Sequence, residues 1–147
     1  MDEESKVHRG YHCVWEIHYH IVFPVKYRKG LLDQEVVEII RNTAIGIHER
    51  YEIDFESMGM DKNHIHILCS AHPKIAPGRI VQLFKSITAR EVFRQKPELK
   101  KDLWGGEFWT DGYYVGTIGD HANWEVIEQY VRNQGQPRED IKQLNLF

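Results

Sequence analysis

Two histidines separated by one residue offer the clearest chemistry in this sequence of 147 residues. His64 and His66 stand in DKNHIHILCS, whose alternating residues are typical of a β-strand. Because side chains two positions apart emerge on one face of a strand, both imidazoles can reach one metal-sized space, while Ile65 and Ile67 point into the core. Imidazole binds divalent transition ions well, and two protein ligands leave positions open for a phosphate oxygen. The pattern favours a metal centre suited to phosphodiester chemistry.

This histidine pair also has an ordinary interpretation, since an H-x-H pattern by itself is common on solvated strand faces. His18 and His20 repeat the pattern on an earlier strand. Spacing alone does not tell which pair binds a metal, or whether both pairs contribute to one site. The role of His18 and His20 therefore stays open at this stage.

A tyrosine and a glutamine near the end of the chain add a second kind of chemistry. In EVIEQYVRNQG, Tyr130 and Gln134 are four residues apart and share one edge of a predicted helix. A phenol with its usual pKa near 10 is a poor nucleophile, so it needs a metal to polarise the phosphate. If this helix docks on the free face of the sheet, Tyr130 can meet the histidines and the Gln134 carbonyl oxygen can be a third ligand. The alternative is a tyrosine that only packs its ring.

The elements that position these residues follow from periodicity and turn chemistry. Alternation predicts one strand over 14–23 with one solvent-exposed face. Further strands are predicted over 52–60, 63–70 and 107–118. Helical spacing predicts a helix over 33–49 opened by Asp33, and a second helix that follows Pro77 and ends near Pro97. A final helix is predicted from Asn123 to residue 133 or 134, closed by Gly135 and Pro137.

The order β-α-β-β-α-β plus a terminal helix indicates an α+β, ferredoxin-like (split βαβ, RRM-like) fold. In this arrangement two helices cover one face of an antiparallel sheet, and the other face is left free. The C-terminal helix would carry the nucleophile to that free face. At 41% hydrophobic and 12% aromatic residues, the chain is predicted to form a single domain over 1–147, with a core of about 12–136 and a short irregular tail.

The composition and the motifs that are missing indicate the cellular compartment and argue against some cofactors. Cys13 and Cys69 stand alone, and the polar start MDEESK does not resemble a signal peptide, so we expect a reducing cytoplasm. No apolar run approaches the roughly 20 residues that span a bilayer, so no membrane association is expected. The sequence also contains no G-x-x-x-x-G-K-[ST] loop, and no nucleotide cofactor is expected.

Charge gives a mixed indication about nucleic acid. The formal net charge of −3 argues mildly against a DNA partner, because most DNA-binding domains carry a basic excess. Local clusters can still bind DNA without a basic average. The candidate DNA-binding residues lie in PVKYRKG and on the polar side of the second helix: Lys26, Arg28, Lys29, Arg79, Lys85 and Arg90. Four aromatic residues, Trp104, Trp109, Tyr113 and Tyr114, are expected mainly in the core, although one or two can stack on bases.

Together these motifs resemble the single-tyrosine HUH transposases of bacterial and archaeal insertion sequences. The resemblance rests on the H-I-H strand, the Y-V-R-N-Q helix, PVKYRKGLL and GEFWTDGYYV, and it spans roughly residues 12–136. It implies that His64, His66 and Gln134 bind Mg²⁺ or Mn²⁺ and that Tyr130 is the nucleophile. It further implies a 5′-phosphotyrosine intermediate, a single-stranded DNA substrate with a hairpin at the element ends, and a homodimer. Whether Tyr130 acts on its own subunit or on the partner stays open.

Three other functions fit part of the pattern. A non-catalytic ferredoxin-like nucleic-acid-binding module would use the histidines only as surface polar residues and would need no metal. A related HUH nuclease acting on repeated genomic hairpins would have the same catalytic residues. A metal-dependent hydrolase, finally, would nick DNA without any attached protein, so substitution of Tyr130 by phenylalanine separates it from a transposase.

Overall fold

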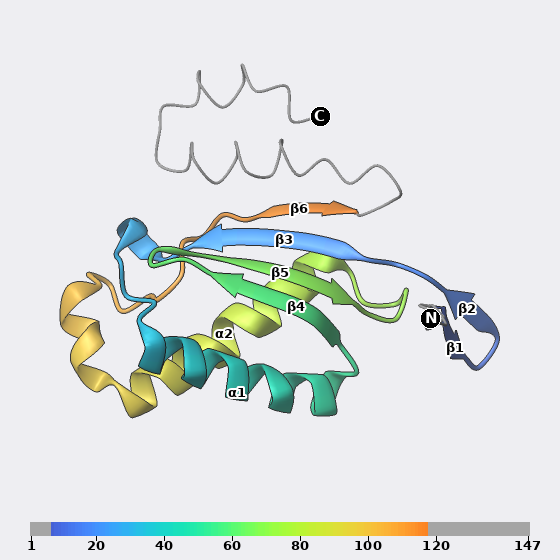
Figure 1. Ribbon diagram of the computed structural model, residues 1–147, viewed down its shortest axis with the longest axis horizontal. Coiled ribbons are helices and arrows are strands. Elements are labelled where there is room, and N and C mark those ends of the chain that lie inside the picture. Colours follow the sequence, from blue (N-terminus) through green and yellow to red (C-terminus); the bar gives the residue numbers. More distant parts are fainter. Residues whose placement is uncertain (1–6, 118–147) are drawn as a thin grey trace, which may run out of the picture.

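A sheet packed on a pair of helices forms the centre of the computed structural model, which describes residues 7–117 (Figure 1). Four antiparallel strands lie in the order β4-β5-β3-β6. Their bounds are β3 (Tyr19–Pro24), β4 (Asp54–Met60), β5 (His64–Ser70) and β6 (Tyr114–Thr117). Helices α1 (Gln34–Tyr51) and α2 (Pro77–Gln95) both cover one face of this sheet (Figure 1). The element order and the sheet order confirm the ferredoxin-like fold.

Both helices begin within a residue of the predicted positions, α2 ends before Pro97 as predicted, and α1 runs to Tyr51, two residues past the predicted 49. The Asp33 carboxylate accepts a hydrogen bond from the Val36 amide at 2.9 Å and caps the start of α1. α2 starts at Pro77, whose missing amide hydrogen costs nothing in the first helical turn. The chain leaves α2 before Pro97 and continues in the short 3-10 helix η2 (Pro97–Asp102). The core-facing stripe of α1 is formed by Val36, Ile39, Ile40, Ala44 and Ile47.

The core lies between the sheet and the helices because alternate strand residues face the helix layer. Ile65 and Ile67 of β5 are 0% and 1% exposed, as their alternation with the histidines predicts. Phe23 of β3 contacts Phe84 of α2 with ring centroids 5.9 Å apart. The Trp109 indole also packs on Phe23, at 4.9 Å. This packing fixes which face of β5 is left for its histidines.

The single strand predicted over 14–23 is wrong, because two separate strands share this segment. β2 (Cys13–Trp15) pairs with β1 (His8–Gly10) in a small sheet of its own, and β3 starts at Tyr19. The solvent-exposed face predicted for this strand is also wrong within β3, since the side chains of His20 and Val22 are only 2% and 0% exposed. Alternation reports which residues share a face, but it does not report the pairing partner.

The predicted strand over 107–118 is confirmed in its second half, β6. Ahead of β6, Trp109 makes an isolated bridge to Val25. The helix predicted from Asn123 and the irregular tail lie outside the described residues. Within residues 7–117, no helix is both long and apolar enough to cross a membrane.

Candidate functional site

The β4–β5 hairpin brings three side chains that could hold a metal ion together on the sheet face opposite the helices. Asp61 lies in the turn, and His64 and His66 follow on β5. One donor atom from each of these residues lies within 4.8 Å of the others. The prediction that His64 and His66 share one face is confirmed, and their ring centroids are 5.0 Å apart. Asp61 was not among the ligands predicted from the sequence, although an acid three residues before the histidine pair was a usable indication.

Hydrogen bonding orients the His64 ring. Its Nδ1 lies 2.8 Å from the Asn63 side-chain oxygen, an acceptor, so Nδ1 carries the hydrogen and Nε2 carries the lone pair. His64 Nε2 is shielded from solvent and makes no hydrogen bond with the described residues. Asp61 Oδ2 is 3.0 Å away, close enough for an ion pair but not aligned as a hydrogen-bond acceptor. The lone pair of His64 Nε2 and a carboxylate oxygen of Asp61 thus lie side by side, where both could bind one metal ion.

The environment keeps this imidazole neutral, as metal binding requires. Burial lowers the pKa of His64 below its usual value, and the positive charge of Arg28 adds to this effect. The Asp61 carboxylate opposes it without reversing the direction. Since only the neutral ring has a lone pair to donate, His64 is ready to bind a metal at neutral pH.

His20 joins the site from the neighbouring strand β3. His66 Nδ1 lies 3.4 Å from His20 Nε2, and the two ring centroids are 5.6 Å apart. Burial first, and then the nearby His66, lowers the pKa of His20 to about 4. His20 is therefore neutral at pH 7 and can accept a hydrogen bond from His66 Nδ1, and in that tautomer His66 Nε2 carries the lone pair that a metal needs. His18 instead pairs with Glu56 on β4.

The donor set fits a small divalent cation. Neutral imidazole nitrogens with a carboxylate oxygen suit Mn²⁺ well, and Mg²⁺ also accepts such a site when phosphate oxygens complete it. The orphaned Nε2 of His64 supports this fit, because a buried nitrogen without a hydrogen-bond partner is costly unless it has another ligand. The residues present therefore fit the metal that the resemblance implies.

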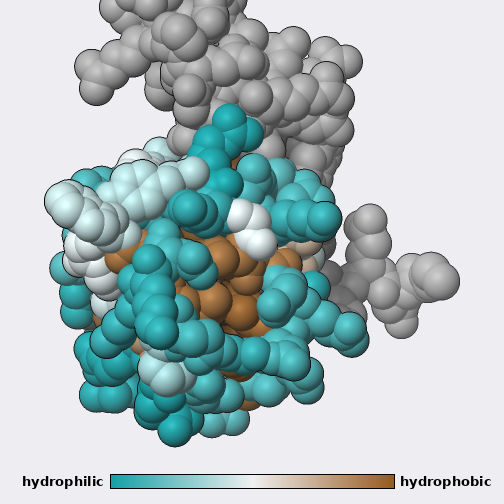
Figure 2. Space-filling view, turned by 90° about the vertical axis from the view of Figure 1, so that its left-hand side faces the viewer, coloured by the Kyte–Doolittle hydropathy of each residue, from teal (hydrophilic) through white to brown (hydrophobic). Residues whose placement is uncertain are grey.

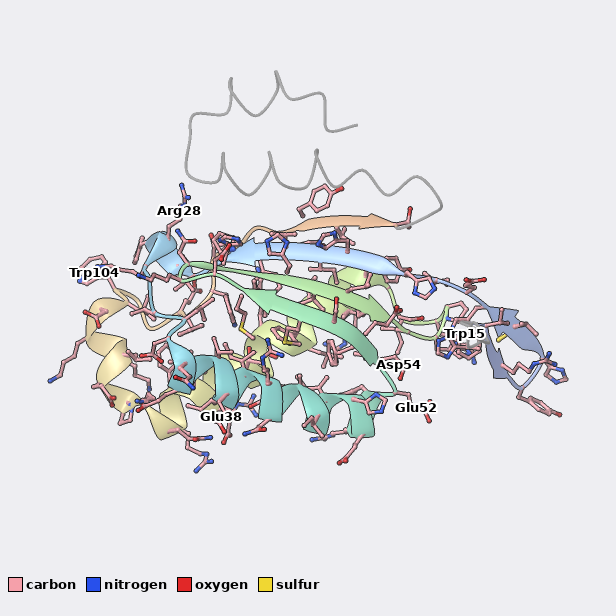
Figure 3. The ribbon with its side chains drawn as sticks, in the orientation of Figure 1. Trp15, Arg28, Glu38, Glu52, Asp54 and Trp104 are labelled. Carbon is pink, nitrogen blue, oxygen red and sulfur yellow. The ribbon has the colours of Figure 1, made fainter. Side chains whose placement is uncertain are left out.

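The first cluster of predicted DNA-binding residues lies beside this site. Backbone bonds from Val25 to Asn63 (2.8 Å) and from Leu32 to Lys62 (2.9 Å) hold the segment 25–32 against the Asp61 turn. Figure 3 shows Arg28 pointing away from the helix layer, on the free side of the sheet. Arg28 and Lys29 are exposed, whereas the Lys26 ammonium donates to Glu107 at 3.0 Å.

The second cluster lies on α2, in the helix layer and away from the histidines. Arg79 and Arg90 are exposed and line a groove of about 640 Å³ between α1 and α2, which Arg50 also lines. Lys85 has a structural environment instead, since its ammonium donates to the carbonyl oxygens of Thr110 (2.6 Å) and Gly112 (2.9 Å). The two predicted clusters therefore face different sides of the molecule.

Two predicted site residues fall outside the described structure. Tyr130 and Gln134 belong to the segment beyond residue 117. Their roles as nucleophile and third ligand stay predictions. The described part of the site is the Asp61–His64–His66 cluster with Asn63, His20 and the cationic segment beside it.

Comparison with known proteins shows which family this chain resembles. The family model described as "Transposase IS200 like" matches residues 13–134. The ISDra2 transposase TnpA of Deinococcus radiodurans is 32% identical over 131 residues, which cover 89% of this chain and 91% of the relative. The transposase of insertion sequence element IS200 from Salmonella typhimurium is 28% identical over 145 residues, covering 99% and 91%.

Solved structures show the same fold. A transposase crystal structure from Deinococcus radiodurans superimposes with a TM-score of 0.77 at 28% identity, and covers 86% of this chain and 97% of that chain. A REP-associated tyrosine transposase bound to a REP hairpin has a TM-score of 0.50 at 12% identity, with coverage of 95% and 78%. At that identity the second likeness concerns the fold alone.

Proposed function

This chain belongs to the IS200-like transposase family, the single-tyrosine HUH type that cleaves DNA and transfers its strands, and we propose how its own residues perform that reaction. The substrate is single-stranded DNA marked by a hairpin at each end of the mobile element. The observation that carries the proposal is the Asp61–His64–His66 cluster, with its orphaned His64 nitrogen, on the open face of the sheet. The match to the family model and to the ISDra2 and IS200 transposases over nearly the whole chain supports DNA as the substrate class.

We assign the metal site to His64 and His66, with Gln134 completing the ligands during the reaction. Asp61 is an additional ligand that the structure suggests, since its carboxylate lies beside His64 Nε2. A bound Mg²⁺ or Mn²⁺ would withdraw charge from the scissile phosphate and so make phosphorus open to attack. Asn63 and His20 hold the two ligand rings in the tautomers that binding requires.

Tyr130 is the proposed nucleophile. Its phenol oxygen forms a bond to phosphorus while the bond from phosphorus to the 3′ oxygen breaks, and the phenol proton is given up as the 3′ oxygen gains one. The products are a 5′-phosphotyrosine and a free 3′-hydroxyl. Because the phosphotyrosine conserves the phosphodiester bond, attack by another 3′-hydroxyl rejoins DNA without ATP.

The proposed DNA path uses both cationic clusters. Arg28 and Lys29, beside the metal ligands, contact phosphates of the strand that is cut, and Lys26 supports this segment through its pair with Glu107. Arg79 and Arg90 contact the hairpin from the groove between the helices. Lys85 acts indirectly by holding residues 110–112 against α2. We expect a homodimer, and the single-domain organisation over 1–147 and the cytoplasmic location remain predictions.

A covalent-adduct assay tests the chemistry. The protein is incubated with labelled single strands from the flanks of its own gene, with Mn²⁺ or Mg²⁺, and the products are separated on a denaturing gel. We expect a metal-dependent protein–DNA adduct that is lost in Tyr130→Phe and in His64→Ala. Nicked DNA without an adduct, unchanged in Tyr130→Phe, would support a hydrolase instead. Binding without metal-dependent cleavage would support the non-catalytic module.

A further inference from the structure

A pair of exposed aromatic side chains lies next to the cationic segment with Arg28 and Lys29, and it has no part in the chemistry above. Trp104 is 86% exposed and Tyr27 is 55% exposed. They come from distant parts of the chain, yet the Tyr27 hydroxyl donates a hydrogen bond to the Trp104 carbonyl oxygen at 3.0 Å. Large aromatic rings are costly to expose, and exposed ones commonly mark binding surfaces.

The fold holds Trp104 outward instead of leaving it loose. The residues around it, Leu103 and Phe108, are 1% and 0% exposed, so the chain is anchored in the core on both sides. Gly105 and Gly106 follow with φ of 91° and 76°, a conformation that residues with a Cβ rarely adopt. Figure 3 shows the indole projecting from the end of the molecule. A segment anchored on both sides thus presents a single aromatic ring to solvent, next to a turn that needs glycine.

Tyr27 is held in a conformation that costs free energy. Tyr27 and Arg28 both have positive φ, 58° and 52°, although neither is glycine. Left-handed backbone at a bulky residue costs about 1–3 kcal/mol, and such residues cluster at functional sites. The strained pair displays the Tyr27 ring toward Trp104 and the Arg28 guanidinium toward the metal side.

The surroundings favour DNA as the occupant of this surface. Arg28 and Lys29 are exposed next to Tyr27, and the charge of Arg28 acts on the metal ligand His64. Lys100 and Lys101 are exposed just before Trp104. Figure 2 looks onto this end of the molecule and shows hydrophobic residues surrounded by hydrophilic ones. Cations around exposed rings suit a polyanion with flat apolar bases.

We propose that Tyr27 and Trp104 form a stacking platform for an unpaired base of the DNA strand that enters the metal site. This inference rests on the proposed function, because it needs a single-stranded DNA substrate. The platform holds one base outside the site while Arg28 and Lys29 hold the adjacent phosphates. Duplex DNA does not use the platform, because its bases are already stacked on one another.

Binding measurements on the full-length protein test the platform. Fluorescence anisotropy would follow a labelled single strand without a hairpin, and the same strand annealed to its complement, in EDTA so that no strand is cut. We expect Trp104→Ala to weaken single-strand binding by about five- to hundredfold, the range of one lost base stack. Duplex binding should change by less than about twofold, and Trp104→Phe should restore most of the single-strand affinity. Tyr11→Ala is the matched control, since Tyr11 is 90% exposed but lies in the β1–β2 hairpin.

Several results would overturn the proposal. Unchanged single-strand affinity in Trp104→Ala would refute it, as would equal losses for single strand and duplex. A loss of self-association in Trp104→Ala, measured by sedimentation, would make this surface a contact between copies of the chain. If the unsubstituted protein binds neither these probes nor a single strand that carries a hairpin, the proposed function fails with it. If it binds DNA and Trp104→Ala binds equally well, only the platform fails.

Discussion

At the scale of single residues, the proposed metal site depends on side chains that orient the candidate ligands as well as on the candidate ligands themselves. The Asn63 amide oxygen fixes the hydrogen on His64 Nδ1, and His20 occupies the equivalent position for His66. The sequence predicted the two ligands from their spacing. It did not predict these partners, because Asn63 looks like an ordinary turn residue and His20 looked exposed. The contact between His20 and His66 depends on the pairing of β3 with β5, which no local pattern contains.

Removal of the Asn63 side chain should weaken metal binding while leaving the fold intact. In Asn63→Ala the hydrogen of His64 can move to Nε2, so we expect the Kd for Mn²⁺ to rise by about 10–100-fold. Isothermal titration calorimetry measures this directly. Asn63→Asp keeps an acceptor and should retain most of the affinity, and Asn42→Ala, at an exposed position on α1, is the control. An unchanged Kd in Asn63→Ala would show that the tautomer is fixed in another way.

The two cysteines should differ sharply in reactivity. Burial, with a smaller effect from Glu56, raises the pKa of Cys69 to about 12. A raised pKa means that the thiolate forms only at higher pH, so at pH 8 Cys69 stays protonated and inert. We expect iodoacetamide to modify the half-buried Cys13 in the native protein and to reach Cys69 only in urea. Peptide mass spectrometry would check this, and equal rates at both positions would contradict it.

At the scale of elements, the parts with local signals were predictable. The cap of α1, the proline start of α2 and the β4–β5 hairpin all carry their signals within a few residues. The β1–β2 hairpin carries none, since its turn residues are Tyr11 and His12, and His12 has a φ of 69° without being glycine or asparagine. Its strands are held by packing of Trp15 against His8, with ring centroids 5.7 Å apart. Such a contact becomes visible only in three dimensions.

The cap of α1 gives a prediction about stability. Asp33→Ala removes the acceptor for the Val36 amide, and we expect the free energy of unfolding to fall by about 1 kcal/mol. Urea unfolding measures this change. Asp33→Ser should recover most of the loss, because serine caps helices nearly as well. Asp102→Ala, at an exposed position in η2, serves as the comparison and should change little. If both alanine variants unfold at the same urea concentration, the cap contributes nothing measurable.

At the scale of the whole molecule, the net charge of −3 conceals an uneven distribution of cations. The segment with Arg28 and Lys29 lies beside the histidines, whereas Arg79 and Arg90 lie in the groove of the helix layer. From the sequence, all of these cations were named as DNA-binding candidates without being divided into two groups. Their division between two sides of the sheet follows from the topology and could not be read from composition. It also explains how an acidic chain can still offer DNA two cationic surfaces.

This division should appear in the salt dependence of binding. For a single strand without a hairpin, Lys29→Ala should reduce the slope of log K against log salt by about 0.7, the effect of one phosphate contact. Arg90→Ala should leave that slope unchanged and alter it only for a hairpin substrate. Anisotropy titrations at several salt concentrations would measure both slopes. Equal effects of the two substitutions on both substrates would argue against separate contact surfaces.

Because β5 pairs with a strand on each side, insertions and deletions within it should be poorly tolerated. His64 and His66 lie opposite Pro24 and Val22 of β3, and β4 holds the other edge of the strand. One residue inserted between the histidines would place them on opposite faces of the sheet, and one ahead of them would disturb the Asp61 turn. Viable copies of this gene should therefore be free of insertions and deletions across residues 61–66, even where substitutions accumulate freely.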